Sequence, residues 1–229
     1  MHIYFVRHGH PDYANDCLTE LGHKQAEAAA KRLMGCGIER IFSSTNGRAV
    51  QTAEHTARAL GLDITSFDFM REISWGSVDG EPILAKGHPW LLADLFASEG
   101  RSLTDTDWRE KEPFCKSRVV ECERTVIEGL DGWLESLGYK REGEYYRVMG
   151  EDEYGTVAMF SHGGSSTVAL SHLFNLPFPL ACGALHPGFT SITVVKLCGR
   201  VGELIYPKLV IANDDRHIYG IEVDNEFGN

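Results

Sequence analysis

The chain has 229 residues, 43% of them hydrophobic and 24% charged, values typical of a soluble globular protein. Its 22 Lys and Arg against 33 Asp and Glu give a formal net charge of −11, which argues against nucleic acid or an anionic membrane as a partner. The six cysteines show no CxxC spacing, so we interpret them as reduced thiols and not as a zinc ribbon or redox pair. The N-terminal apolar run is too short for a signal peptide or membrane helix, and we therefore expect a cytoplasmic protein.

The first third of the chain alternates short apolar runs with amphipathic stretches. Thr19 is a good N-cap, and the alanines and leucine after it follow helical spacing until Gly35. The predicted elements are a strand at 2–6, a helix after Thr19 that ends at Gly35, a strand at 40–43, a helix at 48–60 and a strand at 63–67. This order of strand, loop and helix predicts an α/β fold with mostly parallel central strands.

Residues 82–150 interrupt this alternation and then give way to it again. Helical stretches are predicted at 89–96 and 119–137, with a charged loop or hairpin after them. The later predicted elements are a strand at 156–160, a turn at 161–164, a helix at 167–174 and strands at 191–197 and 204–209. We expect one domain over 1–229: a three-layer α/β/α sandwich, with the segment at 82–150 as a helical insertion that covers the active site.

Polar residues follow three of the predicted strands. The first strand ends in Arg7-His8-Gly9, the second leads to Arg48 at a helix start, and the strand at 156–160 leads to His162 and a pair of glycines. Because ligands of parallel sheets bind at the carboxyl ends of the strands, these junctions are expected to meet in one crevice. A cation in the first turn of a helix is unfavourable unless an anion lies there, so the pattern predicts a receptor for a phosphoryl group.

The residues at these junctions also offer a nucleophile and a proton donor. His8 stands at the end of a rigid strand, and histidine can act as a covalent catalyst in its neutral form. Glu72, in a loop after the third strand, is a candidate acid and base. The sequence contains neither an HExxH motif nor a cysteine in a phosphate loop, so metal-assisted and phosphocysteine routes lack their signatures.

Five segments in the same order resemble the histidine phosphatase superfamily, also called the phosphoglycerate mutase-like family. They run from residue 3 to residue 218 and leave the insertion unmatched. The segments are RHG at 7–9, LTELGHKQA at 18–26, SSTNGRAVQTAE at 43–54, REISWGSVDG at 71–80 and SHGG at 161–164, with ANDDRHI at 212–218 similar to a further segment of the phosphatases.

The resemblance implies a role for each matching residue. His8 would become phosphohistidine, and Glu72 would protonate the leaving group and then activate water. Arg7, Arg48 and His162 would bind the phosphoryl oxygens. The backbone at Gly163 and the side chain of Asn15 are added as phosphate contacts. No metal and no cofactor is implied.

The sequence departs from the family pattern in one loop. Family members commonly carry Glu or Gln after RHG, where this chain has His10. The asparagine of the family has no clean match, because Ala14 stands at the usual offset and Asn15 one place later.

These observations predict a metal-independent phosphatase whose partner is a small phosphorylated molecule. A phosphoglycerate mutase is the first alternative, although the insertion shows no paired arginines such as the mutases carry. A catalytically weak, phosphate-binding regulatory module and a metal-dependent hydrolase that uses His8, His10 and His162 are the others. Sugar phosphates, nucleotides, cofactor precursors and phosphoprotein all stay open as substrates, and no oligomeric state is predicted.

Overall fold

A six-stranded sheet forms the centre of the protein. The computed structural model describes residues 1–78, 89–150 and 155–221. The strands lie in the order β11-β9-β1-β8-β4-β5, and β1, β8, β4 and β5 are parallel. At one edge, β9 runs antiparallel to β1, and β11 runs antiparallel to β9. Their bounds are His2–Arg7 (β1), Arg40–Ser44 (β4), Ile64–Phe67 (β5), Thr156–Ser161 (β8), Ile192–Lys196 (β9) and Lys208–Asp214 (β11). The expected α/β fold with a mostly parallel sheet is confirmed.

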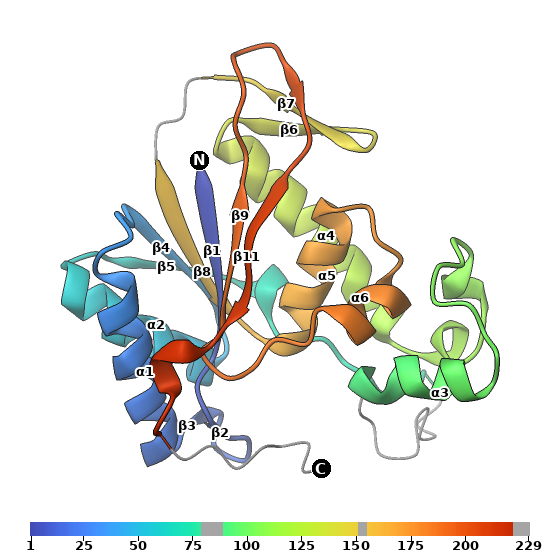
Figure 1. Ribbon diagram of the computed structural model, residues 1–229, viewed down its shortest axis with the longest axis horizontal. Coiled ribbons are helices and arrows are strands. Elements are labelled where there is room, and N and C mark those ends of the chain that lie inside the picture. The colour runs from blue at the N-terminus through green and yellow to red at the C-terminus, as the bar shows by residue number, and fades with distance from the viewer. Residues whose placement is uncertain (79–88, 151–154, 222–229) are drawn as a thin grey trace.

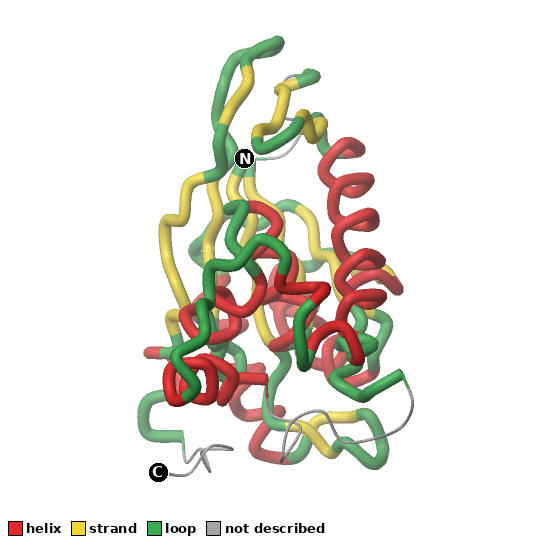
Figure 2. Tube along the Cα trace, turned by 90° about the vertical axis from the view of Figure 1, so that its right-hand side faces the viewer, coloured by secondary structure: helices red, strands yellow, loops and turns green. Residues whose placement is uncertain are grey.

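Helices cover both faces of this sheet, so the molecule has three layers (Figures 1 and 2). Their bounds are Glu20–Leu33 (α1), Gly47–Leu60 (α2), Leu92–Ser98 (α3), Val119–Ser136 (α4), Gly163–Leu173 (α5) and Phe178–Ala184 (α6). The predicted ends of the first two helices are confirmed: Thr19 accepts a hydrogen bond from the Gly22 amide, and Gly61 ends α2 in the left-handed conformation. Within the described ranges, none of the helices is both long and apolar enough to cross a membrane.

Alternating residues of each strand build two separate cores. Ile3 and Phe5 of β1 belong to the core under α4 and α5, whereas Val6 packs with Ile41 and Ala53 on the face covered by α1 and α2. Successive side chains of a strand point to opposite faces, so a strand between two helical layers needs apolar residues at both parities. This is why the run HIYFV is apolar almost throughout.

The predicted strand at 204–209 is in fact two strands in different sheets. Leu204–Ile205 (β10) pairs with Tyr145–Val148 (β7), and β11 starts after Pro207 and pairs with β9. Proline has no N–H to donate, and it stands where the chain leaves one sheet for the other.

The predicted insertion contains α3, α4 and a hairpin of Tyr139–Glu142 (β6) and β7. Its expected start at 82 and the following residues to 88 lie outside the described residues. A short 3-10 helix at Pro89–Leu91 precedes α3. Figure 1 shows α3 to one side of the sheet, beside α6. The sequence analysis did not predict α6.

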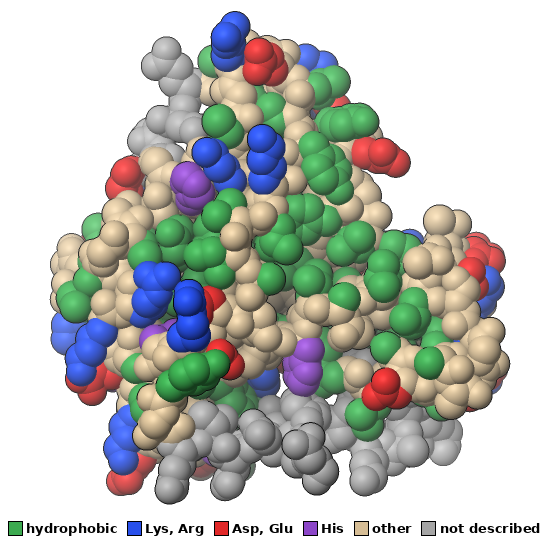
Figure 3. Space-filling model, in the orientation of Figure 1, with side chains coloured by type: hydrophobic (Ala, Val, Ile, Leu, Met, Phe, Trp, Pro, Cys, Tyr) green, Lys and Arg blue, Asp and Glu red, His purple; other side chains and the backbone are tan. Residues whose placement is uncertain are grey.

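Figure 3 shows one face of the molecule, with basic and acidic side chains close together over α1 and α2. Hydrophobic side chains gather in the middle of the same face. Acidic and basic side chains are therefore interspersed on this face. The negative net charge of the chain does not by itself decide whether a site binds an anion, because that depends on the residues of the site.

Candidate active site

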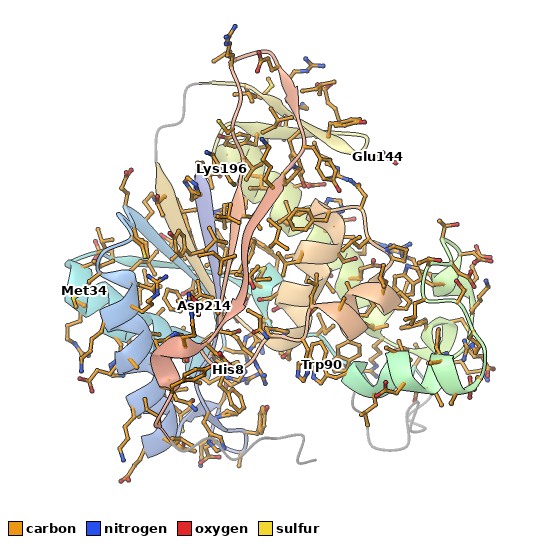
Figure 4. All side chains as sticks on the ribbon, viewed as in Figure 1. His8, Met34, Trp90, Glu144, Lys196 and Asp214 are labelled. Atoms are coloured by element: carbon orange, nitrogen blue, oxygen red, sulfur yellow. The ribbon has the colours of Figure 1, made fainter. Side chains whose placement is uncertain are left out.

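The carboxyl ends of β1 and β8 hold the two predicted histidines next to each other. Arg7 and Ser161 are partners in the parallel ladder, and the His8 amide donates to the Ser161 carbonyl at 2.9 Å. The next residues in each chain segment are therefore neighbours, and the ring centroids of His8 and His162 lie 5.1 Å apart. Figure 4 labels His8 at this end of the sheet. Sheet pairing thus brings together two residues that are 154 positions apart in sequence.

The ring of His8 is fixed in one tautomer. It is 1% exposed, and its Nδ1 lies 2.7 Å from the carbonyl oxygen of Gly9. A carbonyl only accepts, so Nδ1 carries the proton and Nε2 keeps its lone pair. Burial, together with the charge of Arg7, holds the pKa of His8 well below its usual range. The ring is therefore neutral and nucleophilic at Nε2 at neutral pH.

His162 caps the start of α5 and presents one ring nitrogen for a ligand. Its Nε2 lies 2.8 Å from the hydroxyl of Ser44, at the end of β4. Its Nδ1 is buried, and no atom of the described part of the chain bonds to it. Burial and the charges of Arg48 and Arg7 lower its pKa strongly. When its Nδ1 carries the proton, His162 can donate a hydrogen bond to a phosphoryl oxygen.

Both predicted arginines are buried at this end of the sheet, 6% exposed for Arg7 and 7% for Arg48. Arg7 donates through Nη1 to the Pro187 carbonyl at 2.9 Å and lies 4.2 Å from the ring centroid of Phe189. The charges of both arginines act on both histidines. Two buried guanidinium groups beside neutral imidazoles favour a dianion in the space between them.

Asp16 is a further residue at this end of the sheet, which the sequence analysis did not predict. Its carboxylate accepts from the Gly47 amide at 2.8 Å and from Arg48 Nη1 at 2.5 Å, at the start of α2. We expected a phosphate to balance the cation at this helix start, but the carboxylate of Asp16 already lies there. The Arg48 nitrogen Nε is buried and has no hydrogen-bond partner among the described residues. Asp16 therefore fixes one side of the guanidinium and leaves another side for a ligand.

Glu72 occupies the N-terminus of α5. Its Oε1 accepts from the amides of Gly164 at 3.0 Å and Ser165 at 3.2 Å, and from its neighbour Ile73 at 3.0 Å. Burial raises the pKa of Glu72, although these amides and the nearby arginines act in the opposite direction. A carboxyl with a raised pKa spends more time protonated, which is what a proton donor to a leaving group needs.

The two glycines of the SHGG segment belong to α5 and not to a turn before it. The sequence analysis placed the helix start at Thr167, but α5 starts at Gly163. A Cβ at Gly164 would lie 2.6 Å from the Glu72 carboxylate oxygen and 2.5 Å from the Ile73 side chain. Glycine is needed here because Glu72 approaches the first amides of the helix so closely, which the local sequence does not reveal.

The loop after His8 holds the two residues that depart from the family pattern. Asn15 is exposed, and its side-chain amide donates to Asp12 at 2.8 Å. Asn15 therefore bonds to Asp12 of its own loop. His10 contacts Thr19 at 3.0 Å through Nδ1 and lies against Phe189, so its ring supports the start of α1.

Three side chains of this cluster are the one set within the described ranges that could together hold a metal ion. His8, Glu72 and His162 each offer one such atom, all within 4.8 Å of one another. The charges of Arg7 and Arg48 lower the pKa of both histidines, and the same field repels a divalent cation and attracts an anion. The electrostatics therefore favour phosphate over metal.

The chain is similar to known proteins over most of its length. The profile of the histidine phosphatase superfamily (branch 1) matches residues 3–206. The Probable phosphoglycerate mutase GpmB of Yersinia pestis (strain Pestoides F) is 35% identical over 147 residues, which are 59% of this chain and 64% of that protein. The match thus spans slightly less than two thirds of the curated relative.

Solved structures share the fold. The native mycobacterial glucosyl-3-phosphoglycerate phosphatase is 26% identical, with a TM-score of 0.64 over 93% of this chain and 98% of the other. The phosphoserine phosphatase of Entamoeba histolytica, in complex with 3-phosphoglyceric acid, is 19% identical, with a TM-score of 0.62 over 95% of this chain and 98% of the other. The second likeness shows the fold alone.

Proposed function

The chain belongs to the histidine phosphatase superfamily, and we propose that it is a metal-independent phosphatase of small phosphorylated metabolites. The observation that carries this proposal is the tautomer of His8: the Gly9 carbonyl holds the proton on Nδ1, which leaves Nε2 as a nucleophile beside two buried arginines. The rest of the cluster supplies an acid and an anion receptor around it.

In the first step, the lone pair of His8 Nε2 attacks phosphorus, and the bond from phosphorus to the ester oxygen breaks. Glu72 in its protonated form gives its proton to the leaving oxygen, so that the product departs as an alcohol. Arg7, Arg48 and His162 bind the other phosphoryl oxygens and stabilise the negative charge in the transition state. The positive charge on the phosphorylated ring is stabilised by the Gly9 carbonyl at Nδ1.

In the second step, water attacks the phosphohistidine from the side that the alcohol has left. The Glu72 carboxylate takes a proton from this water, the bond from phosphorus to Nε2 breaks, and its electron pair returns to the ring. Inorganic phosphate leaves, and Glu72 is protonated again. The cycle restores the starting protonation states and needs no metal ion.

A phosphoglycerate mutase is the second candidate, favoured by the name of the curated relatives. Two cations of the predicted insertion argue against it, since a local carboxylate neutralises each of them: Arg109 pairs with Glu123 at 2.6 Å, and Lys111 with Asp105 at 2.5 Å. A mutase needs cations for the carboxylate of its substrate. Mutase activity that bisphosphoglycerate stimulates, and that exceeds hydrolysis, would favour this alternative.

The proposal is tested with the wild-type protein and a panel of phosphate esters in the presence of EDTA. We expect release of inorganic phosphate that EDTA does not reduce, together with a phosphorylated protein that is stable in alkali and labile in acid, as phosphohistidine is. Activity that EDTA abolishes and a divalent metal restores would point to the metal-dependent alternative. Binding of phosphate without turnover of any ester would point to a regulatory module.

A further inference from the structure

An indole edge lies against Gly163, the first residue of α5, beside Arg7 of the phosphate cluster. A Cβ at Gly163 would lie 2.9 Å from Cζ2 and 3.5 Å from Cη2 of Trp90, and 3.6 Å from Nε of Arg7. One small volume is therefore bounded by the benzo edge of Trp90 and by the arginine of the phosphate cluster. Trp90 is half-buried, and Figure 4 labels it on the same side of the molecule as His8.

Stacked aromatic rings hold Trp90 in this place. His186 lies parallel to it, with ring centroids 4.5 Å apart and an interplanar angle of 12°. Trp75 meets Trp90 edge to face at 6.1 Å and stacks in turn on Phe178 of α6. These rings come from segments far apart in sequence, and they form a continuous row. We call Trp90 and His186 the aromatic wall.

The wall is tied to the arginine that binds the phosphoryl group. His186 precedes Pro187, and the Pro187 carbonyl accepts a hydrogen bond from Arg7 Nη1 at 2.9 Å. The loop that supports the indole thus also orients the guanidinium. A substrate whose phosphate contacts Arg7 therefore meets the wall at a fixed distance.

The wall also lies beside the proton donor. Glu72 Oε1 accepts from the Gly164 amide, and Trp90 covers Gly163, the residue immediately before it. Adjacent Cα atoms are about 3.8 Å apart. An ester oxygen within reach of Glu72 is therefore close to the indole edge, so the wall borders the leaving group beside the arginine that holds the phosphoryl oxygens.

We propose that the aromatic wall is a leaving-group subsite for an uncharged alcohol that carries a ring rich in C–H groups, a carbohydrate or an aromatic ring. This inference rests on the proposed phosphatase function. The C–H edges of indole gain free energy by covering apolar ring surface. A leaving alcohol with a carboxylate or ammonium group next to the ester carbon would lose hydration at the same surface.

The experiment compares four esters with the wild-type protein and with Trp90→Ala. Glucose 6-phosphate and p-nitrophenyl phosphate carry uncharged rings, whereas phosphoserine and 3-phosphoglycerate carry charged leaving alcohols. We expect Trp90→Ala to lower kcat/KM for both ring esters about 10-fold or more, mainly through KM, and to leave the charged esters within about 3-fold. A loss for only one ring ester would identify which kind of ring the wall binds.

Two further variants keep the test decisive. Leu91→Ala, at the exposed neighbour of Trp90, is the matched control and should leave all four esters unchanged. His186→Ala removes the stacking partner of Trp90. It should also lower kcat/KM for the ring esters relative to the charged esters, but by less than Trp90→Ala does. It also tests the wall if Trp90→Ala does not fold.

Two failures can be told apart. If the wild type hydrolyses neither these four esters nor any other phosphate ester of the panel, the proposed function fails. Suppose instead that the wild type is active. If both wall variants lower kcat/KM by the same factor for all four esters, or lower it for none, the leaving-group subsite is refuted while the phosphatase function stands.

Discussion

The two ends of the proposed substrate site are built by different means. At the phosphate end, ladder hydrogen bonds between β1 and β8 set the positions of the two histidines, and the arginines beside them are buried. At the leaving-group end, ring stacking holds Trp90, which comes from the predicted insertion. In the proposed mechanism, the sheet therefore fixes the chemical step, whereas side chains added to the sheet set the choice of substrate.

The comparison predicts that variants at the phosphate end act on all esters alike. His8→Ala removes the nucleophile, so we expect kcat to fall by about 10⁴-fold or more for charged and uncharged esters. Rates of phosphate release measure the loss, and labelling with a radioactive ester should no longer give phosphorylated protein. The surface variant His55→Ala, in α2 outside the cluster, is the control. A residual rate that differs strongly among esters would contradict a common nucleophile.

Glu72 lies between the two ends, so its replacement should depend on the leaving group. We expect Glu72→Gln to lower kcat/KM for alkyl phosphates by about 10²- to 10³-fold and for aryl phosphates far less, since kcat/KM reports the first step, in which a phenolate departs without a proton. A ratio of the two losses near one would contradict the assignment of the acid.

The pH dependence of alkyl-ester hydrolysis gives a second test of Glu72 as the acid. Because burial raises its pKa, the carboxyl stays protonated to a higher pH than an ordinary glutamate, and alkyl hydrolysis should fall as pH rises through that raised pKa. The lowered pKa of His8 keeps the nucleophile neutral well below the ordinary histidine range, so the acid limb should lie at low pH. Glu72→Gln should abolish the basic limb for alkyl esters. A basic limb that persists in this variant would assign it to another group.

The adjacent glycines of α5 separate the two ends most directly. A methyl group at Gly164 would meet the Glu72 carboxylate, whereas one at Gly163 would meet Trp90. We expect Gly164→Ala to reduce alkyl hydrolysis about 10-fold more than aryl hydrolysis. Gly163→Ala should instead change the ratio of ring esters to charged esters. The two variants are matched controls for each other, and identical substrate profiles would contradict the separation of the two ends.

Local sequence sufficed to predict that the strand ends carrying Arg7, His8 and His162 meet. A buried strand that stops at Arg7 and His8, and another that leads to His162, are local patterns, and parallel pairing brings their ends together. The cap at Thr19 and the helix end at Gly61 are also set by neighbouring residues. These features follow from propensity and from the period of the apolar residues.

Contacts between distant segments could not be predicted in this way. Asp16 reaches Arg48 across 32 positions, and Glu72 caps α5 from 92 positions upstream of Gly164. Without the Glu72 carboxylate at its amides, the glycine pair resembles a turn, and the predicted helix therefore began too late. The stacking of Trp90 on His186 is likewise a tertiary contact that the sequence around neither residue predicts.

The last prediction concerns a buried carboxylate outside both ends, for which the comparison predicts an effect on stability alone. Asp214 accepts two hydrogen bonds from the Arg216 guanidinium at 2.8 and 2.9 Å, and this pairing lowers the pKa of Asp214 to about 2. A folded-state pKa below the unfolded one gives stability above the ordinary aspartate range that is lost as pH falls towards 2. We expect Asp214→Asn to lower the free energy of unfolding by about 1–2 kcal/mol at pH 7 and by little near pH 2. Urea unfolding at both pH values measures this, with Asn in place of the exposed Asp63 as the control.

Because Asp214 lies in β11 at the sheet edge, kcat/KM should stay within about 3-fold of wild type for every ester. A larger loss confined to one class of ester would show that the sheet edge also contributes to substrate choice.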